Sequence, residues 1–400
     1  MQNKSIRRGV TYGILMTIPA LLLLLEEKLM VGQLCVQGSD ARVYISIADN
    51  FVSTGHFIQT ARPYIGLVVP PGTPFMITLF RLFGLSDYGI MAAQTLMFGL
   101  DNVLLFETEK CVLGKGLWAP IIFTLACMRS YLRLGMVMVE HYYLFLLCLA
   151  IWIVYNRMKM PKKIILLNIV GLAMILTRPI LATVYLCILL YTLFWCWKNR
   201  NHKIGTAMIL LPILIMAFNI TINHRETGEY ILLENYSGYD LYMASRPDAP
   251  VTIEESSQYI VDEPDINRIR ENSTLTASER NNLFKNLAKQ NCRNNFGVWI
   301  KNSICRGYEL FIKKYAFVTL YSLCGGFLLA ARELRQKNFR ATIMLTLTLM
   351  LVALTSLGIV ELRYTMVIWP MASIHGAYIT DMLVQHISTR VHRKASKKLT

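Results

Sequence analysis

The sequence predicts an all-α, polytopic membrane protein with about ten transmembrane helices and with its reactive side chains on the extracytoplasmic side. Of the 400 residues, 54% are hydrophobic and only 16% are charged, and the mean hydropathy is +0.41. This composition is too apolar for a soluble domain, which needs polar surface in proportion to its size. The lipid bilayer is therefore the first partner that the sequence implies.

About ten apolar runs can cross the hydrocarbon core as helices. The first follows Lys4, Arg7 and Arg8 and resembles the apolar core of a signal peptide. Glu26 and Glu27 come next, where a cleavage site would need small residues, so we expect a retained helix. The runs span residues 9–25, 88–106, 117–137, 140–155, 163–176, 180–195, 204–220, 315–329, 341–360 and 365–382.

The basic residues between these runs set the predicted orientation. With the N-terminus in the cytoplasm, alternation places a Lys or Arg cluster at every cytoplasmic connection, as the positive-inside rule requires. The clusters lie within residues 110–115, 157–163, 198–203, 332–340 and 390–398. Both termini are then cytoplasmic. The formal charge of +16 reflects membrane orientation, and no nucleic-acid partner is expected.

The same alternation divides the chain into three parts. Residues 1–220 form a transmembrane catalytic module whose first outside loop is 26–87, residues 221–314 form an extracytoplasmic subdomain, and residues 315–400 form C-terminal helices with a basic cytoplasmic tail. In the first loop, residues 71–84 are apolar but too short to span, which predicts an interfacial or half-inserted helix. In the subdomain, Thr276 and Glu279 predict a capped helix that carries Phe284 and Leu287 on one face.

Several classes of chemistry lack a signal in the sequence. The nine cysteines contain no C-x-x-C pair, and no metal-ligand spacing occurs, so we expect no metal and no other cofactor. Cys292 and Cys305 both fall outside, and the sequence leaves open whether they form a disulfide. The cytoplasmic connections are too short for a nucleotide-binding domain, and there is no Gly-rich phosphate loop.

The first outside loop carries the strongest candidate for catalysis, Asp40. One interpretation is an ordinary helix-capping carboxylate. However, Tyr44 and Ala48 follow at i+4 and i+8, which predicts that Asp40 begins a short helix on the membrane, with its carboxylate directed into a recess between the helices. A fixed, partly desolvated carboxylate of this kind can remove a proton from an acceptor hydroxyl.

Several short motifs follow one another along nearly the whole chain, each on the predicted outer side. They are Asp40 with Tyr44, Arg62-Pro63, Pro70-Pro71 before Phe75, Leu82-Phe83-Gly84, Glu140, Thr177-Arg178-Pro179, the segment 235–242, and Glu361-Leu362-Arg363-Tyr364 with Pro370. In this order the chain resembles the C-type superfamily of membrane glycosyltransferases, which includes protein mannosyltransferases and the lipid A aminoarabinose transferase.

This resemblance implies transfer of a sugar from a polyprenyl-phosphate donor to an envelope glycan or lipid-linked acceptor, with inversion, at a bacterial inner membrane. Asp40 would act as general base, and Arg178 and Arg363 would hold the donor phosphate. Glu140 and His141 would orient the acceptor or the sugar, although an interfacial anchor is an equal interpretation of Glu140. The remaining candidates for substrate binding are Tyr44, Arg62, Glu361 and Tyr364.

The chain also departs from the family pattern. Ala41 stands where many relatives carry a second acidic residue, and Val69 replaces the usual Lys or His before the Pro-Pro pair, leaving Arg62 as a substitute. Arg129 and Arg133 near the outer end of the third helix are either snorkelling residues or phosphate contacts. Tyr142, Tyr143 and Trp369 are interpreted as residues of the aromatic belt, and Asp101 as a structural hydrogen-bonding residue.

Two other function classes compete with the glycosyltransferase. An O-antigen polymerase also has about ten helices and one large outside loop, but would depend on arginines rather than on an acidic base. A flippase or transporter for lipid-linked sugars predicts inverted repeats and paired broken helices, which the sequence does not display.

Overall fold

The structure is a computed structural model that describes residues 39–61, 68–131, 137–258, 274–358 and 362–399, with single positions at 11, 13–15, 17, 18, 266, 268, 269 and 272. Within these residues all regular structure is helical and no strand occurs. The all-α prediction is therefore confirmed for the described part of the chain. The first predicted run, 9–25, lies largely outside it.

Every other predicted apolar run forms a helix. Five segments are long and apolar enough to cross a membrane, which makes the chain a multi-pass membrane protein, and α5, α6 and α16 are apolar but shorter. The helices are α4 (Asp87–Leu113), α5 (Trp118–Tyr131), α6 (Val139–Tyr155), α7 (Met160–Thr177), α8 (Ala182–Lys198), α9 (His202–Thr227), α15 (Ala316–Arg335), α16 (Arg340–Ser356) and α17 (Trp369–Leu399).

Local signals set the ends of these helices. Ser86 caps α4 by accepting a hydrogen bond from the Gly89 amide, and Gly114 ends the helix in the left-handed region at φ +80°. Gly228 ends α9 in the same way, at φ +75°. The predicted apolar run 204–220 therefore stops short of the helix end, because the helix continues without a break as far as Thr227.

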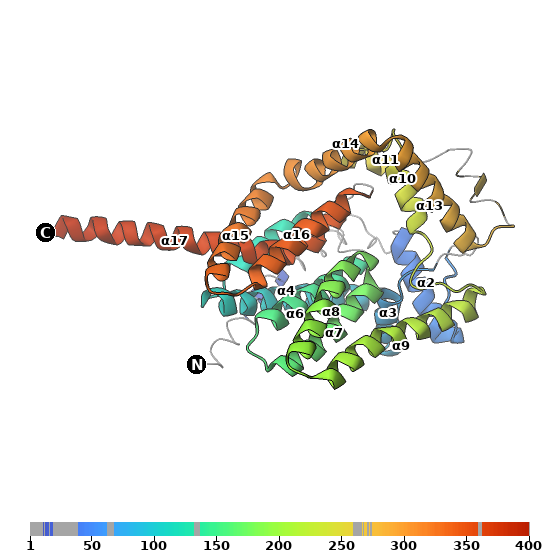
Figure 1. The fold of residues 1–400 in the computed structure, drawn as a ribbon, viewed down its shortest axis with the longest axis horizontal. Coiled ribbons are helices and arrows are strands. Elements are labelled where there is room, and N and C mark those ends of the chain that lie inside the picture. Colours follow the sequence, from blue (N-terminus) through green and yellow to red (C-terminus); the bar gives the residue numbers. More distant parts are fainter. Residues whose placement is uncertain are drawn as a thin grey trace.

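The first half of α17 lies in the centre of the bundle. It packs against α5 and α15, and Trp369 and Ile374 are completely buried. The contact with α15 is close because Gly325 has no side chain: a Cβ there would lie 2.0 Å from the His375 carbonyl oxygen. The second half of α17 extends away from the body of the molecule (Figure 1).

The predicted outside segments contain shorter helices. In the first loop, α2 (Ser39–Thr54) packs against α3 (Gly72–Leu82), and α3 packs against α7. After α9 come α10 (Ser237–Ser245), α11 (Ile253–Gln258), α13 (Ala277–Asn294), α14 (Phe296–Gly307) and the π-helix η3 (Tyr308–Lys313). In Figure 1, α13 and α14 form an arch that returns the chain to α15.

The arch has its own small core. Tyr242 and Met243 of α10 pack with Phe284 and Ala288 of α13, separately from the main core. The predicted cap of α13 is confirmed, because Thr276 and Glu279 form a reciprocal capping box. Cys292 and Cys305 are both free thiols.

Candidate functional site

The helix α2 places Asp40 beside residues from the far end of the chain. Asp40 lies in the first turn, as predicted. On the same face, Tyr44 is 8% exposed and Ala48 is completely buried against the main core. This buried face fixes the helix and therefore the position of the Asp40 carboxylate.

Asp40 forms an ion pair with Arg363, 323 residues further along the chain. The Nη1 atom of Arg363 donates a hydrogen bond of 2.8 Å to Oδ2 of Asp40. The Asp40 side chain is 40% exposed and that of Arg363 is 16% exposed, so water reaches one side of the pair. Arg363 belongs to η4 (Leu362–Ile368), the short 3-10 helix that leads directly into α17.

A second pair joins Arg178 to Glu140. Arg178 follows the last residue of α7 and precedes Pro179, which disfavours helical backbone at the preceding residue, and its φ of −146° is extended. The side chain therefore leaves the line of the helix. Its Nη1 atom lies 3.7 Å from Oε1 of Glu140, in the first turn of α6, where the side chain is only 3% exposed.

Aromatic rings connect the two ion pairs. The guanidinium carbon of Arg178 lies 5.0 Å from the centre of the Tyr364 ring, and that of Arg363 lies 5.4 Å from the same ring. Arg178 also lies 5.8 Å from the ring of Tyr143. These distances permit cation–π attraction. Asp40, Glu140, Arg178, Arg363 and Tyr364 thus form one group, which we call the charged cluster.

The electrostatics agree with this geometry. Burial would lower the pKa of Arg178, but Glu140, Tyr143 and Tyr364 together outweigh burial and raise that pKa above its ordinary value. Burial raises the pKa of the Tyr44 hydroxyl, and the Asp40 carboxylate raises it further. The positive charge of Arg363 lowers the pKa of both Arg178 and Tyr44 in part, so both lie close to Arg363. Tyr44 therefore belongs to the surroundings of the charged cluster and stays neutral at physiological pH.

The segment after α9 closes over the first outside loop. The amide of Val68 donates to Oδ1 of Asn235 at 2.8 Å, and the amide of Asn235 donates to the Val68 carbonyl at 3.3 Å. Asn235 is 7% exposed. Burial raises the pKa of the next residue, Tyr236, and the neighbouring Arg178 guanidinium lowers it in part. The segment 235–242 therefore meets the first loop next to the charged cluster.

The remaining predicted site residues have different positions. His141 is 4% exposed and follows Glu140 on α6, where consecutive side chains point in different directions, so it is not on the face that meets Arg178. Arg62 and Glu361 lie outside the described residues, as do Arg133 and the side chain of Arg129.

The aromatic-belt interpretation is wrong for three residues. Tyr142 is 2% exposed, Tyr143 is 1% exposed and Trp369 is completely buried, whereas a belt residue faces the lipid headgroups. Tyr143 instead contacts Arg178. A sequence signal for this contact exists, because Tyr143 follows Glu140 at i+3 and so shares its face of α6.

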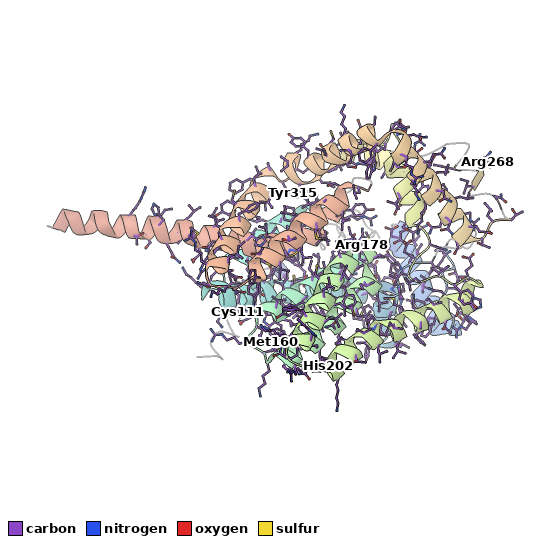
Figure 2. The ribbon with its side chains drawn as sticks, in the orientation of Figure 1. Cys111, Met160, Arg178, His202, Arg268 and Tyr315 are labelled. Atoms are coloured by element: carbon purple, nitrogen blue, oxygen red, sulfur yellow. The ribbon has the colours of Figure 1, made fainter. Side chains whose placement is uncertain are left out.

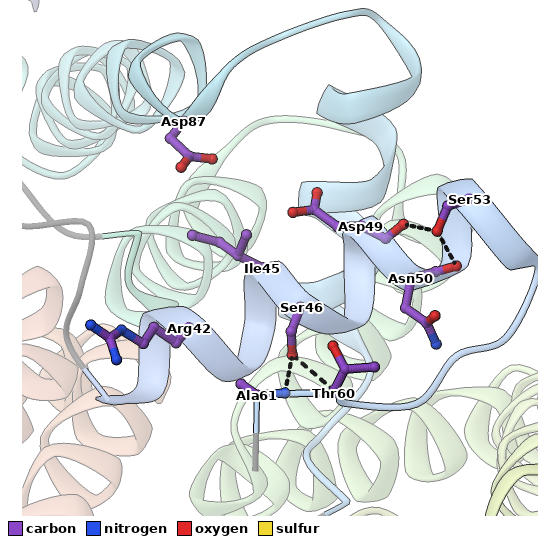
Figure 3. A pocket seen from close by; sticks show the side chains of 9 residues that line it. All are labelled: Arg42, Ile45, Ser46, Asp49, Asn50, Ser53, Thr60, Ala61 and Asp87. Atoms are coloured by element: carbon purple, nitrogen blue, oxygen red, sulfur yellow. Dashed lines mark hydrogen bonds between the residues drawn. The ribbon is translucent and has the colours of Figure 1, made fainter. Parts of the chain in front are cut away.

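A polar cavity of 490 Å³ lies beside the first outside loop, on a different face of α2 (Figure 3). Helical geometry turns Arg42, Ser46 and Asp49 away from Asp40. Asp49 pairs with Arg81 at 2.7 Å, and Arg81 also pairs with Asp87. The carboxylates of Asp49 and Asp87 are therefore both neutralised by Arg81, which fixes the wall of the cavity. The cavity is separate from the charged cluster.

No metal centre is evident in the described part of the chain, where no group of three or more His, Cys, Asp and Glu residues is arranged to hold an ion. Comparison with protein-family models, with curated proteins and with solved structures finds no significant match for this chain.

Proposed function

We propose that this protein is a glycosyltransferase that moves a sugar from a polyprenyl-phosphate donor to an envelope glycan or lipid-linked acceptor on the extracytoplasmic side of a bacterial inner membrane. The observation that carries the proposal is the contact between Asp40 and Arg363, with Arg178 joined to them through Tyr364. A carboxylate and two guanidinium groups next to one another can serve as a base and as a phosphate-binding site.

In the proposed reaction the acceptor hydroxyl attacks the anomeric carbon of the donor sugar. The hydroxyl proton goes to the Asp40 carboxylate, and the bond between the anomeric carbon and the phosphate oxygen breaks with inversion. Polyprenyl phosphate leaves with increased negative charge, which Arg178 and Arg363 stabilise. When the donor phosphate binds Arg363, it competes with Asp40 for the guanidinium and frees the carboxylate to act as base.

The proposal includes about ten transmembrane helices, with both termini in the cytoplasm. The charged cluster supports this arrangement because it draws on the end of α7, the first turn of α6 and the segment before α17. These three helix ends belong to the same predicted side. Glu140 and Tyr44 line the proposed site, and Arg62 and Glu361 are kept as predicted substrate-binding residues.

An O-antigen polymerase is the second candidate. The ion pair of 2.8 Å between Arg363 and Asp40 is the observation that favours this second function. In a polymerase the Asp40 carboxylate would only hold Arg363 in position, and the arginines would carry out the reaction. The two functions differ in their need for the carboxylate. Asp40→Asn removes the base but keeps a side chain of the same shape.

Purified protein incubated with a panel of polyprenyl-phosphate sugars and acceptors tests the function through release of free polyprenyl phosphate. We expect Asp40→Asn to lower the rate by about 10²–10⁴-fold, the usual contribution of general acid–base catalysis. Asp49→Asn is the matched control, because Asp49 also pairs with an arginine, at 2.7 Å, but on the other face of α2. Transfer that survives Asp40→Asn at normal protein levels would refute the proposed mechanism.

A further inference from the structure

A groove of 370 Å³ runs between α6, α7, α8 and α16, away from the charged cluster. Its floor is apolar and buried, formed by Leu147 and Ile151 of α6 and Leu167 of α7. Its exposed lining residues lie on α8, in the connection just before α16 and at the start of α16, among them Tyr191 at 44% and Ile343 at 45%. The groove therefore opens sideways between these two helices, where a membrane protein faces lipid.

One end of the groove is strongly basic. It is lined by Lys163, Lys337 and Arg340, and Met160, another lining residue, lies at the opposite end of α7 from Arg178 (Figure 2). Lys337 and Arg340 belong to one of the clusters that the positive-inside rule assigns to the cytoplasm. The basic end therefore lies at the predicted inner face of the membrane.

Two polar groups at this end are buried. Lys163 is 5% exposed, and its Nζ atom donates a hydrogen bond of 3.0 Å to the Val154 carbonyl. No ion pair involves Lys163 or Arg340 in the described part of the chain. Tyr155 is 6% exposed, and its hydroxyl has no hydrogen-bond partner within that part. The nearby Glu333 carboxylate accepts the Ala341 amide at 2.9 Å and so caps α16.

We propose that this groove binds a phospholipid with an anionic headgroup. The phosphate would accept hydrogen bonds from Lys163, Arg340 and the Tyr155 hydroxyl, and one acyl chain would lie along α6 between α8 and α16. A buried ammonium group next to a second cation is costly unless an anion compensates it. Basic pockets between transmembrane helices at the cytoplasmic face suit lipid phosphates.

The shape of the groove distinguishes a lipid from a free anion. A soluble phosphate would use only the basic end and leave the apolar floor empty, whereas a lipid fills both. The volume is at the small end of ligand pockets, which measure roughly 300–1,000 Å³, so the groove accommodates one chain while the rest of the lipid stays in the bilayer. This site is independent of the proposed glycosyl transfer.

Native mass spectrometry of the purified, delipidated full-length protein tests the site. The probes are phosphatidylglycerol, phosphatidylcholine with the same chains, and glycerol phosphate as the headgroup alone. We expect phosphatidylglycerol to bind at least tenfold more tightly than either of the others. Equal binding of phosphatidylcholine would overturn the anionic site, and equal binding of glycerol phosphate would show a plain anion site.

Variants locate the binding. Lys163→Gln should weaken phosphatidylglycerol binding at least tenfold, whereas Lys162→Gln should not, because Lys162 is exposed on the same helical turn. Ile343→Trp provides a second variant that keeps the buried lysine: its side chain sits at the exposed rim and should exclude the acyl chain. Unchanged binding in both Lys163→Gln and Ile343→Trp would refute the proposal.

Discussion

Glu140 and Arg178 provide the sharpest test of how the charged cluster is held together. The Glu140 side chain is 3% exposed, and neither carboxylate oxygen has a hydrogen-bond donor within the described residues. Arg178 lies 3.7 Å away, is 26% exposed and also packs over Tyr143 and Tyr364. Removal of Arg178 therefore leaves the buried Glu140 carboxylate without a counter-ion. Removal of Glu140 leaves the Arg178 guanidinium, which can still be hydrated.

The expected costs follow from this asymmetry. Arg178→Gln should lower the free energy of unfolding by about 3–5 kcal/mol, as found when one partner of a buried ion pair is removed. Glu140→Gln should cost about 1–3 kcal/mol, because the partner left behind is partly hydrated. The double variant should be less destabilised than the sum of the two by about 0.5–3 kcal/mol, since neither charge remains unpaired.

Unfolding followed by tryptophan fluorescence in a mild detergent measures these differences. Glu107→Gln is the control, because Glu107 also lies 3.7 Å from a cation, Lys110, but its side chain is 26% exposed, whereas that of Glu140 is 3% exposed. We expect its effect to be about 1 kcal/mol or less. Equal costs for Glu140→Gln and Arg178→Gln, or strict additivity in the double variant, would refute the account of a buried anion held by one cation.

Three further predictions concern the outside segments. Thr276→Ala breaks the capping box of α13 and should cost about 1 kcal/mol, measurable by the same unfolding assay. Gly72→Ala places a Cβ 2.8 Å from the Leu176 carbonyl and should cost about 1–3 kcal/mol through overpacking; an unchanged unfolding midpoint would contradict this close approach of α3 to α7. Glu226→Gln weakens the contacts of Glu226 with Arg225 and with His56, the latter at 3.0 Å, and should cost about 1 kcal/mol or less, because both partners are largely exposed.

Periodicity predicted the helix that carries Asp40 because Tyr44 and Ala48 mark one face of it. The same pattern, with its Thr276 cap, predicted α13. Both signals are local, since they rest on residues within a few turns of one another. The end of α9 was missed for a related reason: the prediction stopped where the apolar run stopped, although Gly228, the residue that ends the helix, comes later.

The contacts of the charged cluster could not be derived from periodicity or composition. The pairing of Asp40 with Arg363 joins segments 323 residues apart, and only the folded chain determines that they meet. The burial of Tyr143 was missed because an aromatic residue near a helix end is typical of the membrane interface. The i+3 spacing from Glu140 indicates instead that Tyr143 shares the buried face of Glu140. That spacing can be interpreted only once Arg178 is known to face α6.

The positions of the four charges explain how such a cluster can persist and still accept a ligand. Asp40 and Glu140 each lie in the first turn of a helix, where the helix dipole favours a carboxylate. Arg178 and Arg363 lie on non-α backbone, at an extended pre-proline position and in a 3-10 helix. Both carboxylates are therefore stabilised partly by their own helices, and Asp40, which water also reaches, need not be bound tightly by Arg363. In the proposed reaction the anionic donor can then take over Arg363 without unfolding the helix that holds Asp40.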